Sequence, residues 1–234
     1  MTARSQAGTS LLPPRDQVRA DFDRLATLLD AGSEPVTLYH SLLLEQVPRP
    51  CAHALDIGCG TGTFARALAA RAGHVTAIDL SPVMIRRARE QSAGVSNLTF
   101  VEADLQQWPL TPDHYDFIAS IATLHHVPAE ATLLAWAKAL RPGGVLAVLD
   151  VRMPRGVGER ALELMAYGVS ALSRLSRTGR LLMPREVREF WNQHGSRERY
   201  LSAAEARALG ARLLPGSVVR RHLLWRYSLL WRKS

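Results

Sequence analysis

Apolar and polar residues follow two different rhythms along this chain. Between residues 53 and 151, short apolar runs alternate with stretches in which apolar residues recur every three or four positions. The short runs predict buried strands, and the longer spacing predicts amphipathic helices. Such an alternation favours an α/β fold with a parallel sheet covered by helices on both faces. The expected strands are 53–58, 74–79, 98–103, 115–121 and 144–150, and the expected helices are 63–73, 82–92 and 129–140.

The rhythm differs on both sides of this central segment. Helical spacing marks 16–30 and 36–47 before it, and 159–175, 185–195 and 202–214 after it, whereas residues 216–234 alternate as two strands do. We therefore divide the chain into 1–50 (tail and helices), 51–151 (core), 152–214 (helical insertion) and 215–234 (closing strands).

Composition narrows the class of protein. The chain has 234 residues, 47% of them apolar, and no apolar stretch long enough to cross a membrane or to serve as a signal peptide. The net charge of +8 is almost all arginine and is scattered, which favours a solvated surface over a nucleic-acid patch. Cys51 and Cys59 offer neither a disulfide framework nor a zinc-ligand set, so we expect a cytoplasmic protein without a metal.

A glycine-rich loop follows the first expected strand. Asp56 ends the apolar run, and Gly58, Gly60 and Gly62 follow in "LDIGCGTG". Glycines at these positions let the backbone turn sharply and approach a ligand. The G-x-G-x-G spacing differs from the dinucleotide fingerprint, and no lysine follows as in a P-loop. The acid ahead of the loop would repel a pyrophosphate but suits a cationic ligand.

Two further acids extend this pattern. Asp79 ends the second strand, 21 residues beyond Gly58, where a carboxylate can bond ribose hydroxyls. Asp104 follows the third strand and could accept a hydrogen bond from an adenine amino group. Three carboxylates without a phosphate site together point to S-adenosylmethionine. Asp56 could instead serve turn geometry, and Asp104 could cap a helix.

The motifs "LDIGCGTG", "AIDLSPVMI", "VEADLQQWPL", "ATLHHV" and "LRPGGVLAVLD" occur in this order. Over residues 53–151 the chain resembles the class I S-adenosylmethionine-dependent methyltransferases, nearest to the type 11 and ubiquinone/menaquinone small-molecule kind. The resemblance implies a Rossmann-like sheet of seven strands, mostly parallel with the last antiparallel, and a helical cap over the site. The cofactor-binding residues that we expect are Asp56, Gly58, Cys59, Gly60, Gly62, Asp79, Leu80, Met84, Asp104, Leu105 and Ile121.

The same resemblance implies which part of the cofactor each of these residues contacts. Asp56, Gly58 and Gly60 border the methionine moiety, and Asp79 holds the ribose. Met84, Asp104 and Leu105 contact the adenine, and Ile121 lies near the sulfonium. Cys59 could equally be packing within the loop, and Met84 could be core alone.

Two adjacent histidines are the candidates for chemistry on the methyl acceptor. His125 and His126 follow the fourth strand, and a histidine can take a proton near neutral pH. Either ring could instead hold the loop or line the cofactor pocket. His194 is a further candidate. The residues expected to meet the acceptor are Tyr39, His40, Asp150, Met153 and Trp191, together with Met165, Tyr167, Leu172 and Met183 of the insertion, which could also be the core of the cap.

We therefore predict an S-adenosylmethionine-dependent methyltransferase acting on an O, N or C atom of a small apolar or aromatic molecule, such as a secondary metabolite or quinone. An RNA-modifying enzyme is one alternative, although "SIATLHH" lacks the Asn/Asp-Pro-Pro-aromatic tetrad and the Pro-Cys pair of base methyltransferases. A cofactor-binding protein, or an enzyme using the cofactor for another reaction such as cyclisation, is a second. We expect a monomer or a homodimer.

Overall fold

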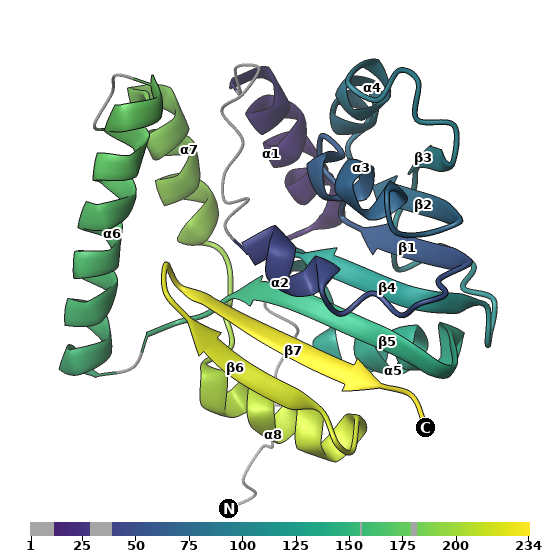
Figure 1. Ribbon diagram of the computed structural model, residues 1–234. Helices are drawn as coiled ribbons and strands as arrows, with labels where there is room; N and C mark the ends of the chain where they lie inside the picture. The colour runs from purple at the N-terminus through teal and green to yellow at the C-terminus, as the bar shows by residue number, and fades with distance from the viewer. Residues whose placement is uncertain (1–11, 29–38, 155, 179–181) are drawn as a thin grey trace, which may run out of the picture.

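The computed structural model describes residues 12–28, 39–154, 156–178 and 182–234. Its centre is one seven-stranded sheet with the order β3-β2-β1-β4-β5-β7-β6 (Figure 1). Strands β1 to β5 are parallel, and β7 is antiparallel to both β5 and β6. The predicted sheet is thus confirmed. The strands are β1 (His53–Ile57), β2 (His74–Asp79), β3 (Leu98–Glu102), β4 (Tyr115–Ile121), β5 (Leu140–Val151), β6 (Val218–His222) and β7 (Arg226–Arg232).

Helices cover both faces of this sheet. On one face, α2 (His40–Leu44), α3 (Thr63–Ala69) and α4 (Pro82–Glu90) bury a cluster that includes Phe64 and Phe117. On the other, α5 (Ala129–Ala139) and α8 (Ala203–Leu213) pack on Leu55, Ile118 and Leu146. Adjacent residues of β1 and β4 enter opposite clusters, as the two-residue repeat of a strand requires.

Two helices from opposite ends of the chain meet beside the carboxyl ends of the strands. These are α1 (Arg15–Leu28) and α7 (Arg185–Gly195), which contact each other, and α1 also contacts α4. Leu25, Met84 and Phe190 form a small apolar cluster between the three helices. Because α1 and α7 are far apart in sequence, this cluster fixes the cap against the core.

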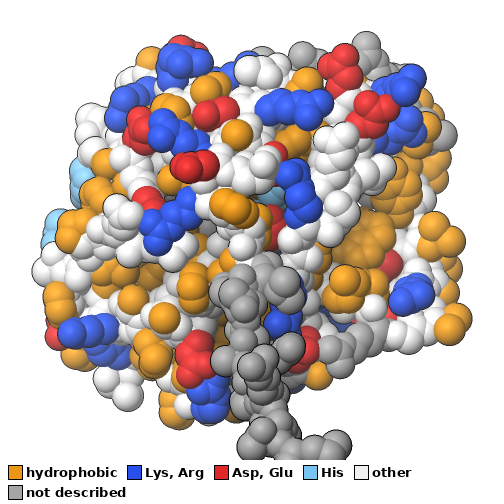
Figure 2. Space-filling model, turned by 180° about the vertical axis from the view of Figure 1, so that it is seen from behind, with side chains coloured by type: hydrophobic (Ala, Val, Ile, Leu, Met, Phe, Trp, Pro, Cys, Tyr) orange, Lys and Arg blue, Asp and Glu red, His pale blue; other side chains and the backbone are white. Residues whose placement is uncertain are grey.

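The long helix α6 (Val157–Thr178) stands at the side of the molecule (Figure 1). The buried Arg152 side chain, which bonds to Glu159 and Glu163, anchors its first half. Further along, Leu164, Met165 and Leu172 are exposed, and Figure 2 shows apolar side chains gathered on the side where α6 lies. The alternative that Met165 and Leu172 form the core of the cap is therefore wrong, and their contact with the acceptor stays a prediction.

Several boundaries also differ from the predicted ones. Strand β5 begins at Leu140, before the "RPGG" expected to precede it, and the register with β4 shifts between Tyr115 and Phe117. Gly143 takes a positive φ of 79° at this irregularity. Helix α2 has only five residues, whereas the expected segment 36–47 begins outside the described residues. None of the described helices is long and apolar enough to cross a membrane.

Helix α4 begins at the cap that its sequence predicts. The Ser81 hydroxyl accepts a hydrogen bond from Met84 N at 3.1 Å, and Pro82 occupies the first turn. The same hydroxyl donates to Asp23 Oδ1 at 2.5 Å, which joins α1 to α4. The buried Ser81 hydroxyl thus stabilises the N-terminus of α4 and also holds α1 against it.

We predict that Ser81→Ala lowers the free energy of unfolding by about 1–2 kcal/mol. The substitution removes the N-cap hydrogen bond of α4 and leaves Asp23 without the hydroxyl donor of Ser81. Urea denaturation measures the change. Ser196→Ala is the matched control, since Ser196 is exposed and follows the C-terminal end of α7, and it should change stability by less than about 0.5 kcal/mol. Equal losses in the two variants would contradict the capping role.

Candidate cofactor and acceptor site

A cavity lies at the carboxyl ends of β1, β2 and β4, where open α/β sheets bind ligands. It is bordered by the glycine loop, the loops after β3 and β4, and helices α1 and α7. Its lining residues are Pro13, Arg15, Val18, Phe22, Leu25, His40, Asp56, Gly58, Cys59, Gly60, Thr61, Thr63, Phe64, Ile78, Asp79, Leu80, Met84, Ala103, Asp104, Leu105, Gln106, Ile121, Ala122, Thr123, His126, Val127 and Trp191.

The glycine loop follows β1 in a conformation that other residues rarely adopt. Gly58, Gly60 and Gly62 have φ values of 73°, 53° and 80°. A Cβ on Gly58 would lie 2.0 Å from Thr123 Oγ1, so glycine is also required there by close packing against the loop after β4. Gly58 N and Cys59 N both donate to the carbonyl of Ile78. The loop is therefore tied to the end of β2.

Asp79 completes this connection. Its Oδ2 accepts from Gly60 N at 2.8 Å, and its Oδ1 accepts from Ser81 N at 2.9 Å. Burial raises the pKa of the carboxyl above its usual range, although the two backbone donors oppose that shift. The Asp79 side chain thus fixes the glycine loop beside the start of α4, and it also lines the cavity.

Asp56 is a deeply buried acid in the lining of the cavity. The residue is 1% exposed, and its Oδ2 has no hydrogen-bond partner among the described residues. Burial, and then the charge of Asp79, raises the pKa of Asp56 to about 8. A buried carboxylate without partners is costly, so this position favours a cationic group that supplies donors.

Asp104 lies at another part of the cavity wall and is already engaged. Arg15 Nη1 donates to Oδ2 at 2.7 Å, and Gln106 N donates to Oδ1 at 2.9 Å. The first contact links α1 to the loop after β3. A carboxylate has about four acceptor positions, so capacity remains for a ligand amino group.

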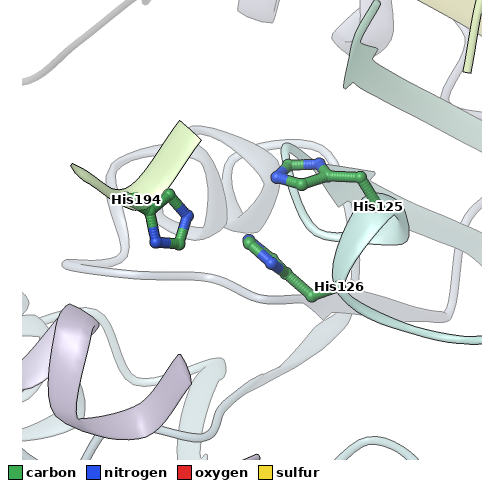
Figure 3. Close-up of side chains that lie close together, drawn as sticks. All are labelled: His125, His126 and His194. Atoms are coloured by element: carbon green, nitrogen blue, oxygen red, sulfur yellow. The ribbon is translucent and has the colours of Figure 1, made fainter. Parts of the chain in front are cut away.

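Three histidines form a layer beside the cavity. His125 and His126 belong to the short helix η2 (Leu124–His126) after β4, and His194 belongs to α7. Figure 3 shows the three rings turned toward one another. His125 Nδ1 lies 2.6 Å from Asp150 Oδ1, inside the core. Of the three, only His126 lines the cavity.

Carboxylates also face the other two rings. His194 Nδ1 lies 3.0 Å from Asp21 Oδ2, and His126 Nδ1 lies 3.1 Å from Glu198 Oε1. Burial lowers the pKa of His126 despite Glu198. For Glu198, burial raises the pKa, but the contact with His126 and its charge outweigh it, and the net shift is downward.

The structure brings most of the predicted residues to the cavity. Of the expected cofactor residues, only Gly62 is not part of the lining; it caps α3 and packs against Phe100. His40 and Trp191 line the cavity, whereas His125, Asp150, Tyr39 and Met153 do not. Tyr39 donates to the carbonyl of Leu223, and Met153 is half exposed.

Other residues at the site were not predicted. Asp21, Phe22 and Glu198 surround the histidines, and Thr123 packs on Gly58. Only Glu198 carries a sequence signal, because it follows His194 by four residues, one turn of a helix. The others depend on contacts between α1 and the core, which no local pattern reveals.

Comparison with known proteins agrees with this geometry. Residues 54–144 match the family model described as a methyltransferase domain. An uncharacterized methyltransferase of Mycobacterium bovis is 31% identical over 198 residues, covering 83% of this chain and 93% of the relative. A ubiquinone biosynthesis O-methyltransferase of Xylella fastidiosa is 39% identical over 110 residues, 46% of this chain and 45% of the relative.

Among solved structures, magnesium protoporphyrin IX methyltransferase from Synechocystis, with bound S-adenosylmethionine, superposes with a TM-score of 0.59. Its sequence identity is 17%, and the match covers 98% of this chain and all of that one. The fold and site define a Rossmann-like transferase. The chain belongs to the class I S-adenosylmethionine-dependent methyltransferases, with S-adenosylmethionine as the methyl donor.

The raised pKa of Asp56 makes stability depend on pH. Between about pH 4 and 8 the folded protein keeps a proton on Asp56 that the unfolded chain has released. The free energy of unfolding should therefore fall as pH rises through this range, by up to about 1.4 kcal/mol per unit from this group.

The measurement is urea denaturation of the ligand-free protein at several pH values, compared with Asp56→Asn, which cannot titrate. We expect the wild-type curve to fall relative to the variant up to about pH 8 and to run parallel above it. Parallel curves throughout would contradict the unpaired burial of this carboxyl.

Proposed function

We propose that this methyltransferase acts on a small apolar or aromatic acceptor bound between the cofactor and the histidine layer. The observation that carries the proposal is the position of His126. Its ring lines the cavity together with the apolar side chains of Phe22 and Trp191. An acceptor there would meet apolar walls and one basic group.

The cofactor is oriented by three acids in this proposal. Asp56 Oδ2 accepts from the ammonium of the methionine moiety, which supplies its missing partner. Asp79 accepts from the ribose hydroxyls while it still holds Gly60 and Ser81. Asp104 accepts from the adenine amino group beside Arg15. Ile121 and Thr123, after β4, then border the sulfonium.

Methyl transfer from a sulfonium is an in-line displacement, so most of the catalysis comes from orientation. A new bond forms between the acceptor atom and the methyl carbon, and the carbon–sulfur bond breaks to give S-adenosylhomocysteine. A hydroxyl acceptor must also lose its proton, which His126 takes. His125, held by Asp150, positions this ring from behind, with ring centroids 3.9 Å apart.

The lining of the cavity and a similar protein both support an apolar or aromatic methyl acceptor. Val18, Phe22, Leu25 and Trp191 give the cavity an apolar wall, and the Xylella fastidiosa relative bears the name of a quinone-pathway enzyme. An RNA substrate is disfavoured because basic and acidic side chains are interspersed over the face in Figure 2, with no continuous basic surface. We infer a phenolic or related secondary metabolite.

We predict that Asp56→Ala weakens the binding of S-adenosylhomocysteine by roughly 10- to 100-fold, since it removes a charge-assisted hydrogen bond worth about 1.5–3 kcal/mol. Isothermal titration calorimetry measures this. Glu130→Ala is the control, because Glu130 pairs with Arg212 on the surface of α5, and its affinity should equal that of the wild type. Unchanged affinity in Asp56→Ala, or binding of NAD in place of the adenosyl ligand, would refute the cofactor placement.

The acceptor is tested by turnover with a panel of phenols, amines, quinone precursors and an RNA. We predict methylation of a phenol, and a loss of roughly 100- to 10,000-fold in kcat for His126→Gln, with little change in the affinity for S-adenosylhomocysteine. Methylation of the RNA alone, or cofactor binding without transfer to any member of the panel, would contradict the proposed acceptor class.

A further inference from the structure

The three histidines of the layer beside the cavity have the arrangement of a metal site. One ligand atom from each of His125, His126 and His194 lies within 4.8 Å of those from the other two. The side chains are only 4%, 7% and 2% exposed. Two come from η2 in the core and one from α7 in the cap, so the cluster bridges the two parts of the molecule (Figure 3).

Each ring has a carboxylate on its Nδ1 side. Asp150 Oδ1 lies 2.6 Å from His125, Glu198 Oε1 lies 3.1 Å from His126, and Asp21 Oδ2 lies 3.0 Å from His194. Histidines that bind metals donate their other ring N–H to a carboxylate or a carbonyl, as His125 and His194 can do here, whereas the His126–Glu198 contact is not a hydrogen bond. The contacts on Nδ1 of His125 and His194 leave Nε2 as the ligand atom of those two rings, whereas both nitrogens of His126 lack a hydrogen-bond partner among the described residues.

The atoms that face the centre lack partners. Both ring nitrogens of His126, Nε2 of His194 and Oε2 of Glu198 are buried and make no hydrogen bond among the described residues. His194 Nε2 lies 3.7 Å from Glu198 Oε1, beyond hydrogen-bond distance. Buried polar atoms are normally paired. Four such atoms in one place, on side chains at least nine-tenths buried, indicate that a group absent from the chain itself completes the layer.

We propose that His125, His126 and His194 bind one divalent transition-metal ion, with Zn²⁺ the best match to three imidazole nitrogens. Nitrogens on one tetrahedral zinc lie about 3.4 Å apart, so the rings draw together slightly on binding. The carboxylates Asp21, Asp150 and Glu198 balance the charge of the ion, and Arg197 already pairs with Asp21. This proposal differs from the prediction of a chain without a metal, because only the fold brings His194 beside His125 and His126.

Such an ion would have two effects. It would join α7 to the core, so the metal should stabilise the cap against unfolding. Three protein ligands leave a fourth position for water or substrate, and since His126 also lines the cavity, an oxygen atom of the acceptor could occupy it. This second effect rests on the proposed function, whereas the metal site itself does not. With the metal bound, the His126 ring would be a ligand of the ion, so its role as the base in the proposed function would apply to the metal-free protein only.

The first experiment uses untagged protein, stripped with a chelator and titrated with Zn²⁺ and with Co²⁺ in the absence of cofactor. We expect one equivalent of Zn²⁺ to bind and to raise Tm, and one equivalent of Co²⁺ to give the visible absorption of a four-coordinate nitrogen site. No stoichiometric binding by the wild type, or binding without those Co²⁺ bands, would overturn the proposal.

Variants then locate the ion. His194→Gln should lose the Co²⁺ bands and bind Zn²⁺ at least 100-fold more weakly, and Asp21→Asn should weaken it roughly 10- to 100-fold. His114→Gln is the control, since His114 lies at the start of β4 and stacks on His53, and it should bind like the wild type. Equal binding by His194→Gln and the wild type would assign the ion to another place.

The two proposals can fail separately. Metal titration without cofactor reports on the histidine layer alone, and calorimetry with S-adenosylhomocysteine on the stripped protein reports on Asp56 alone. Circular dichroism confirms that each variant is folded. If His194→Gln does not fold, the stoichiometry and the Co²⁺ spectrum of the wild type still decide the matter.

Discussion

The site depends on one carboxylate that accepts hydrogen bonds from the backbone of two different loops. Asp79 accepts the amide of Gly60 with one oxygen and the amide of Ser81 with the other. These bonds hold the glycine loop after β1 beside the start of α4 after β2. Ser81 in turn caps α4 and bonds to Asp23 of α1. The cap, the loop and the sheet edge are therefore positioned through a single chain of hydrogen bonds that begins at Asp79.

The same region concentrates acidic side chains away from water. Asp56 and Asp79 lie at the cofactor cavity, and Asp150 and Glu198 face the histidine layer. Burial raises the pKa values of Asp56 and Asp79, so the protein is poised for ligands that bring positive charge. In the proposed placement, a sulfonium cofactor with an ammonium group would satisfy the first pair. A divalent ion among the histidines would satisfy the second.

The sequence predicted the core well because local signals there agree with the tertiary structure. Short apolar runs became β1 to β5, and Ser81-Pro82 marked the start of α4. The cap was harder, since α6 carries a helical apolar pattern but leaves Leu164 and Met165 exposed. Periodicity reveals a helix, and only tertiary packing reveals which face it buries.

In the candidate site, too, the sequence predicts some residues, whereas others meet only through the fold. Acids and glycines at fixed offsets from strand ends, such as Asp56 and Gly58, could be placed from spacing alone. His194, Asp21 and Glu198 could not, because their meeting with His126 depends on α1 and α7 crossing over the sheet edge. Whether a residue such as Asp150 lines the cavity or supports a neighbour also depends on side-chain direction in the folded core.

The most direct test of the account is a crystal structure with S-adenosylhomocysteine. We predict the ligand in the cavity at the carboxyl ends of β1 and β2, with its amino nitrogen within hydrogen-bond distance of Asp56 Oδ2 and its ribose hydroxyls at Asp79. A ligand bound elsewhere, or bound in the reverse direction with its adenine at Asp56, would contradict the assignment of the three acids.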